Sequence, residues 1–201
     1  QYCMNWETLL SFGDSITFGA RSYLSYPEIC GSILEEKLQK SWHVINHSVS
    51  GYTTIDLVRS INPMMQNYKS ANPSIITVMI GTNDIKLNIS LNEFKIAYKQ
   101  LIVKLKLLSI NNNIVLLKIP LFKQKVSYPY NFAMNSQIDL FNSCIEKLAF
   151  ENNLTCFSFS FEDEDHFDGV HLNSIGCATA ALQLGNLILK DKGVESTTTL
   201  P

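Results

Sequence analysis

Long apolar runs, clusters of basic residues and paired cysteines are all missing from this sequence of 201 residues. No stretch approaches the roughly 20 apolar residues that a membrane-spanning helix needs, so we expect no membrane span. The 16 Lys and Arg residues are outnumbered by 18 Asp and Glu residues, which gives a net charge of −2. Because a nucleic-acid surface needs a clustered excess of basic residues, we also expect no nucleic-acid partner.

The cysteines are few, odd in number and scattered: Cys3, Cys30, Cys144, Cys156 and Cys177. Their spacing is not Cys-x-x-Cys, so the sequence predicts no zinc site and no disulfide framework, and most should be buried thiols. Reduced cysteines favour a cytoplasmic location. The sequence begins with Gln rather than Met, which leaves open a removed leader and, with it, secretion.

The length suits one domain with a substantial core, since a chain of this size buries roughly 70% of its unfolded surface. We find no internal repeat and no linker composition. The sequence therefore predicts a single domain over residues 1–194. The polar residues 195–201 are expected to form a disordered tail.

Short apolar runs alternate with helical patterns along the chain. Strands are expected at residues 8–12, 44–46, 74–80, 114–119 and 155–159. Helices are expected at 27–40, 54–68, 90–109, 136–152 and 173–190, with a capping box at Ser90 and a cap at Asn173. Parallel strands need crossover connections, so this order predicts an α/β fold, a three-layer α/β/α sandwich with a five-stranded open parallel sheet.

Polar residues and glycines follow four of the five predicted strands. Ser15 follows the first strand, Gly51 the second, Asn83 the third, and Asp168 with His171 the fifth. The carboxyl ends of parallel strands share one edge of a sheet, where ligands bind. We therefore expect these residues to meet in one cleft.

Ser15, His171 and Asp168 are candidates for a nucleophile, its base and the group that orients the base. Taken alone, Gly-Asp-Ser is also a common turn sequence, and a single histidine is more often structural. Asp168 precedes His171 by three residues, so one turn lets the carboxylate accept the proton of a ring nitrogen. Asp14 is expected to be structural.

Gly51 and Asn83 are candidates for an oxyanion hole, which needs donors placed where negative charge develops. Gly51 offers a backbone N–H without a blocking side chain, and Asn83 offers an amide. Each residue also has a structural interpretation: a helix-entry turn for Gly51, and a loop asparagine bonded to its own backbone for Asn83.

Together these segments resemble a known enzyme family. Phe-Gly-Asp-Ser-Ile-Thr at 12–17, Ser-Val-Ser-Gly at 48–51, Gly-Thr-Asn-Asp at 81–84 and Asp-Gly-Val-His at 168–171 are similar to the four blocks of the SGNH hydrolases, also called the GDSL esterase/lipase family. One position departs from the family name, since Ile16 stands where it has leucine.

The resemblance implies a flavodoxin-like sheet and a serine esterase that needs no metal or other cofactor. It also implies that Asp168 completes a triad with Ser15 and His171. The oxyanion hole would then consist of the Ser15 and Gly51 backbone N–H groups and the Asn83 amide.

From these residues we expect hydrolysis of a small-molecule ester with a small or moderate acyl group. The alternative from another class is a non-catalytic ligand-binding or signalling module on the same sheet. A phosphate- or flavin-binding domain is disfavoured, because no Gly-rich phosphate loop follows the first strand. The class of ester, the acyl length and the oligomeric state are left open.

Two further segments suggest how a substrate is selected. The acidic residues 162–165 either line one rim of the cleft or form a solvated loop. The aromatic residues of 120–132 either form a wall on the other rim or pack over the sheet; they are Phe122, Tyr128, Tyr130 and Phe132. A functional rim and wall would favour neutral substrates with a flat or apolar part.

Overall fold

A five-stranded parallel sheet forms the centre of the computed structural model, which describes residues 6–109 and 111–201. Its strands are β1 (Trp6–Gly13), β2 (Ser41–Ser48), β3 (Ile75–Met79), β4 (Ile114–Leu117) and β5 (Thr155–Phe157). They lie in the order β2-β1-β3-β4-β5, and every neighbouring pair is parallel. This is the strand order of a flavodoxin-like sheet, so the predicted fold class is confirmed.

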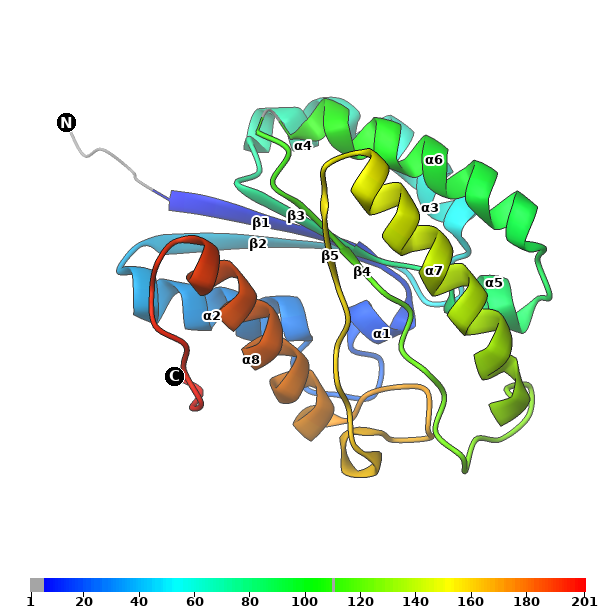
Figure 1. Ribbon diagram of the computed structural model, residues 1–201. Helices are drawn as coiled ribbons and strands as arrows, with labels where there is room; N and C mark the ends of the chain where they lie inside the picture. Colours follow the sequence, from blue (N-terminus) through cyan, green and yellow to red (C-terminus); the bar gives the residue numbers. More distant parts are fainter. Residues whose placement is uncertain (1–5, 110) are drawn as a thin grey trace.

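Helices cover both faces of the sheet (Figure 1). On one face lie α2 (Tyr26–Leu38) and α8 (Ser174–Asp191); on the other lie α3 (Thr54–Ile61), α4 (Met65–Ala71), α6 (Leu91–Leu108) and α7 (Asn135–Glu151). Ser90 forms the predicted capping box with Glu93, and Asn173 caps α8 by accepting from the Gly176 amide. Each interaction satisfies backbone groups that the first helical turn leaves unpaired.

The sheet is the core of the molecule because both of its faces are covered. All residues of β3 and β4 are buried, as expected for near-continuous apolar runs between two helical layers. Two polar residues inside this core satisfy each other, since the Ser11 and Thr77 hydroxyls lie 2.7 Å apart on neighbouring strands. In the helical layer that contains α6 and α7, the Phe94 and Phe141 rings stack at 4.3 Å between centroids.

Besides shifts of one or two residues at strand ends, three features differ from the sequence prediction. The helix expected at 54–68 is divided: α3 ends at Ile61 and α4 begins at Met65, because Pro63 in the intervening 3-10 turn has no N–H to donate. β2 starts three residues earlier than expected. Two short helices, α1 (Ser15–Phe18) and α5 (Thr82–Lys86), directly follow the ends of β1 and β3.

The C-terminal segment contacts α8. Thr197 is buried, its amide donates to the Asn186 side chain at 2.8 Å, and its carbonyl accepts from the Asn186 amide at 2.9 Å. The sequence, which predicts a disordered tail at 195–201, does not indicate these contacts.

Cys30, Cys144, Cys156 and Cys177 are free thiols, of which Cys30 and Cys177 are buried; Cys3 lies outside the described residues. Over residues 6–109 and 111–201, the helices are all too short or too polar to cross a membrane.

Candidate active site

Ser15, His171 and Asp168 form a continuous chain of hydrogen bonds. The Ser15 hydroxyl lies 2.8 Å from His171 Nε2, and His171 Nδ1 lies 2.7 Å from Asp168 Oδ2. A carboxylate only accepts, so Nδ1 carries the proton and Nε2 is free to accept the Ser15 hydrogen. This tautomer is the one that a general base next to a serine needs.

Ser15 owes its position to the sharp exit from β1. The Asp14 carboxylate caps α1 by accepting from the Ile16 amide at 2.9 Å, which places Ser15 at the first position of that helix. Gly13 makes the turn possible: a Cβ atom there would lie 2.3 Å from Thr17 Oγ1, far inside van der Waals contact. The turn after β1 therefore accounts for Gly13 and Asp14 in front of Ser15.

The turn at 168–171 orients Asp168 and His171 toward each other. Asp168 Oδ1 accepts from the backbone amides of Val170 at 3.0 Å and His171 at 2.6 Å, which leaves Oδ2 for the imidazole ring. Gly169 sits between them with φ of +84°, a conformation that favours glycine. Burial raises the pKa of Asp168, but these hydrogen bonds outweigh it and hold the pKa below its usual value.

Of the three predicted oxyanion-hole residues, Gly51 and Asn83 lie on adjoining segments. Asn83 is buried in the first turn of α5 and donates one amide hydrogen to the Tyr52 carbonyl at 2.9 Å, so its side chain bonds to the loop after β2 rather than to its own backbone. Gly51, next to Tyr52, has φ of +85° and open space where a side chain would project. The Val49 amide ties the same loop to the Gly13 carbonyl at 3.4 Å.

Asp84 is a positioning residue that sequence reasoning did not assign. Its carboxylate accepts from the backbone amide of Thr54 at 2.9 Å and from the Thr54 hydroxyl at 3.2 Å, so it joins α5 to the start of α3. Burial raises the pKa of Asp84 to about 6. Burial also raises the pKa of Asp14 to about 7, and the nearby charge of Asp84 contributes to that increase. The sequence feature that could have identified Asp84 is its position directly after Asn83.

The other two histidines near the sheet's carboxyl edge have structural partners. His47 is held by the hydroxyls of Tyr68 and Ser60. His166 bonds through Nδ1 to the Glu162 carbonyl at 3.0 Å. Neither ring bonds to Ser15, so among the described residues only His171 occupies the position of a base.

The acidic segment has a mixed role. Asp165 is buried and accepts from the Glu162 amide at 2.8 Å and the Thr179 hydroxyl at 3.0 Å, so it stabilises the loop itself. Glu162, Asp163 and Glu164 are exposed, as in the solvated-loop interpretation.

Among the aromatic residues of 120–132, Tyr130 contacts the site. Its ring packs edge-on against the His171 ring at 6.3 Å between centroids. Phe122 is buried behind it, at 5.3 Å, whereas Tyr128 is almost fully exposed. The aromatic residues near the site therefore comprise one ring against His171, in the turn at 168–171, and a second ring that supports it.

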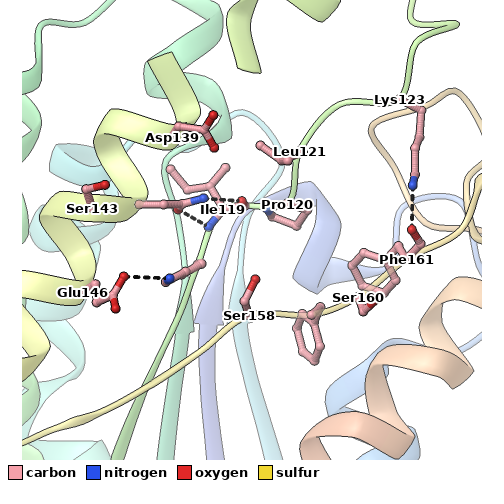
Figure 2. A pocket seen from close by; sticks show the side chains of 13 residues that line it. Ile119, Pro120, Leu121, Lys123, Asp139, Ser143, Glu146, Ser158, Ser160 and Phe161 are labelled. Atoms are coloured by element: carbon pink, nitrogen blue, oxygen red, sulfur yellow. Dashed lines mark hydrogen bonds and ion pairs between the residues drawn. The ribbon is translucent and has the colours of Figure 1, made fainter. Parts of the chain in front are cut away.

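A cavity of about 570 Å³ opens between the segments that follow β4 and β5, beside α7 (Figure 2). The side chain of Asn142 binds the Ile119 amide and carbonyl at 2.7 and 2.9 Å and holds the first segment to α7. Gln183 binds Ser160 in the same way at 2.9 and 2.8 Å and holds the second to α8. Ser15 and His171 do not line this cavity.

The described residues contain no group of three His, Cys, Asp or Glu side chains arranged to hold a metal ion.

Comparisons with known proteins show which family and which fold the chain resembles. The model of the GDSL-like lipase/acylhydrolase family matches residues 11–178. No curated protein sequence matches the chain significantly.

Several solved structures share the fold. The acetyl xylan esterase AlAXEase superposes with a TM-score of 0.72 at 20% identity, covering 90% of this chain and 99% of that one. The acetylxylan esterase Axe2 from Geobacillus stearothermophilus gives 0.68 at 20% identity, covering 96% and 97%. A GDSL-like lipase from Bacteroides thetaiotaomicron gives 0.67 at 15% identity, covering 92% and 89%.

Proposed function

Because the chain belongs to the GDSL-like lipase/acylhydrolase family and is a serine hydrolase acting on ester bonds, we propose that it hydrolyses carboxylic esters of small or moderate acyl groups through an acyl-enzyme on Ser15. The observation that carries this proposal is the hydrogen-bond chain from Ser15 through His171 to Asp168. The names of the similar acetyl xylan esterases support a short acyl group.

In the first half of the reaction, Ser15 Oγ attacks the carbonyl carbon while its proton moves to His171 Nε2. Asp168 stabilises the resulting imidazolium through the Nδ1–H bond. The carbonyl oxygen becomes an oxyanion, which the Ser15 and Gly51 N–H groups and the Asn83 amide are proposed to bind. When the intermediate collapses, the C–O bond to the alcohol breaks and His171 returns the proton to the departing oxygen.

In the second half, water takes the place of the serine. His171 removes a proton from the water as it attacks the acyl carbon, and the same oxyanion donors stabilise the second tetrahedral intermediate. Its collapse breaks the bond to Ser15 Oγ, which regains the proton from His171. The products are the carboxylic acid and the unchanged enzyme.

Covalent labelling tests the identity of the nucleophile. A fluorophosphonate reagent should modify Ser15 alone, because only this hydroxyl is paired with His171. Peptide mass spectrometry locates the adduct, and the Ser15→Ala variant is the control. An adduct mainly on Ser48 or Ser50, in the neighbouring loop, would contradict the assignment.

Turnover separates the enzyme from a non-catalytic binding module on the same sheet. The protein should hydrolyse p-nitrophenyl acetate or butyrate, and the Ser15→Ala variant should lose this activity. Equal rates for the two proteins would show that the release of p-nitrophenol does not depend on Ser15.

A further inference from the structure

A second cavity, of about 480 Å³, lies on the loop that connects β4 to α7. The residues lining it lie within 124–134 and are all uncharged. We call it the loop cavity. Three of its residues are aromatic, Tyr128, Tyr130 and Phe132, and two carry side-chain amides, Gln124 and Asn131.

Tyr130 connects the loop cavity to the proposed catalytic residues. It lines the cavity and packs edge-on against the His171 ring. The backbone of the loop follows the catalytic turn closely: the Lys123 amide donates to the Gly169 carbonyl at 3.0 Å, and a Cβ atom on Gly169 would lie 2.7 Å from a methyl group of Val126. A molecule in the cavity would therefore contact the same Tyr130 ring that packs against His171.

The loop is held in place at several points. Asn135, at the start of α7, binds both the amide and the carbonyl of Phe122, at 2.8 and 2.9 Å. Within the loop, the Tyr130 amide donates to the Ser127 carbonyl at 3.0 Å. The Tyr130 ring is fixed between Phe122 and His171. These contacts present Tyr130 in one orientation before any substrate arrives.

The polar groups of the loop cavity are suited to hydroxyl groups. Within the described part of the chain, the Tyr130 hydroxyl and the Gln124 amide bond to no other residue, and Asn131 uses only its oxygen, in accepting from the Ala133 amide. Burial, followed by the charges of Asp14 and Asp168, raises the pKa of Tyr130, so its hydroxyl stays protonated and able to donate. The cavity thus offers both donors and acceptors without a net charge.

The aromatic side chains of the loop cavity are suited to contact a ring of the ligand. Tyr128 is 96% exposed and Phe132 is 49% exposed, so both present apolar surface to solvent at the same cavity. Large exposed aromatic side chains that gather beside uncharged hydrogen-bonding groups are typical of ligand sites that combine stacking with orientation by polar contacts. An anion or a cation would find no opposite charge among the lining residues.

We propose that the loop cavity binds a neutral sugar ring, the alcohol part of the ester, with Tyr130 donating a hydrogen bond to it. This inference rests on the proposed function and specifies its substrate as an acylated saccharide. Tyr128 and Phe132 contribute ring surface, and the amides of Gln124 and Asn131 contact hydroxyl groups.

Three acetate esters that differ only in the alcohol test the proposal: acetylated xylobiose, phenyl acetate and ethyl acetate. Tyr130→Phe should lower kcat/KM for acetylated xylobiose about fivefold, mainly by raising KM, since one hydrogen bond is lost. Phenyl acetate and ethyl acetate, whose alcohol parts carry no further hydroxyl groups, should lose much less than acetylated xylobiose. Tyr98→Phe, which removes a hydroxyl buried in the core, is the matched control and should change none of the three rates.

Two kinetic results would overturn the proposal. An equal loss for all three esters, seen in kcat and with a displaced pH profile, would show that Tyr130 orients His171 instead of binding the alcohol. An equal loss for phenyl acetate and acetylated xylobiose would show that the cavity does not recognise hydroxyl groups.

Binding of unacetylated xylobiose separates this inference from the proposed function. In NMR titrations the amide signals of residues 124–134 should shift, and Tyr128→Ala should weaken the binding, with Phe150→Ala on the exposed end of α7 as the control. Absence of these shifts overturns the loop cavity as a sugar site even if esters are hydrolysed. Shifts without any ester hydrolysis support the sugar site and count against the proposed function alone.

Discussion

At the scale of single residues, the proposed reaction needs Ser15 and His171 together. The hydroxyl is a weak nucleophile until the imidazole accepts its proton, and without the hydroxyl the imidazole has no nucleophile with which to form the acyl-enzyme. They are 156 positions apart in the sequence and 2.8 Å apart in the fold. This coupling determines how their variants should behave.

Ser15→Ala and His171→Ala should each remove most of the ester hydrolysis, and the double variant should cost little more than either one, because members of a triad act as a unit. Asp168→Ala should be less damaging. The measurement is kcat/KM for p-nitrophenyl acetate in the three variants and the double variant. Losses that multiply in the double variant would show that the two residues act independently.

Asn83→Ala tests whether the amide binds the oxyanion. Its removal should lower kcat by about 10² to 10³ and leave KM nearly unchanged, because the charge it would stabilise develops only in the transition state. Steady-state kinetics with a short-chain ester provide both constants. A higher KM with an unchanged kcat would assign Asn83 to substrate binding in the ground state.

At the scale of elements, the short helices α1 and α5 begin next to buried carboxylates. Asp14 caps α1, and Asp84 in α5 binds the first residue of α3. Each carboxylate satisfies backbone amides that would otherwise lack a partner, yet burial opposes its ionisation. The protein therefore positions Ser15 and Asn83 at the expense of stability above neutral pH.

Asp14→Asn should increase stability at alkaline pH. The pKa of Asp14 is about 7 in the folded protein, well above the value of about 3.8 for an unburied aspartate, so the folded state binds an extra proton between these pH values. Stability linked to Asp14 is therefore fully present below pH 3.8 and is lost progressively as the pH rises to about 7.

Asparagine keeps the capping oxygen and does not ionise. The stability advantage of the variant over the unmodified protein should grow by on the order of 3 kcal/mol between pH 5 and pH 9. Denaturation by urea at a series of pH values measures this difference, with Asp191→Asn on the exposed end of α8 as the control. A difference that does not change with pH would contradict the burial of an ionisable Asp14.

At the scale of the whole molecule, the C-terminal segment joins the domain through Thr197. Removing residues 195–201 deletes two hydrogen bonds to Asn186 and one buried side chain, so it should lower the free energy of unfolding by about 1–2 kcal/mol. Ester hydrolysis should be unaffected. Urea denaturation measures the effect, and removal of residues 200–201 alone is the control. Equal stability of the two shortened chains would support the disordered tail that the sequence predicts.

The sequence by itself determined the order of strands and helices and the four segments that carry Ser15, Gly51, Asn83 and His171. These follow from local chemistry: apolar runs long enough for buried strands, glycines where the backbone must turn, and capping residues at helix starts. Helix boundaries were less predictable where one residue decides them, as at Pro63, which divides the helix expected at 54–68.

Only the tertiary structure decided which side chains meet across the sheet. The sequence has no means of showing that the Asn83 amide bonds to the Tyr52 carbonyl, or that Tyr130 packs against His171, because both contacts depend on how loops from different strands fold over the same edge. Asp84 directly follows Asn83 in the sequence, but its role depends on its contact with Thr54 at the start of α3, which only the tertiary structure shows. Local propensity acts over a few residues, whereas the packing of loops depends on the position of every strand in the sheet.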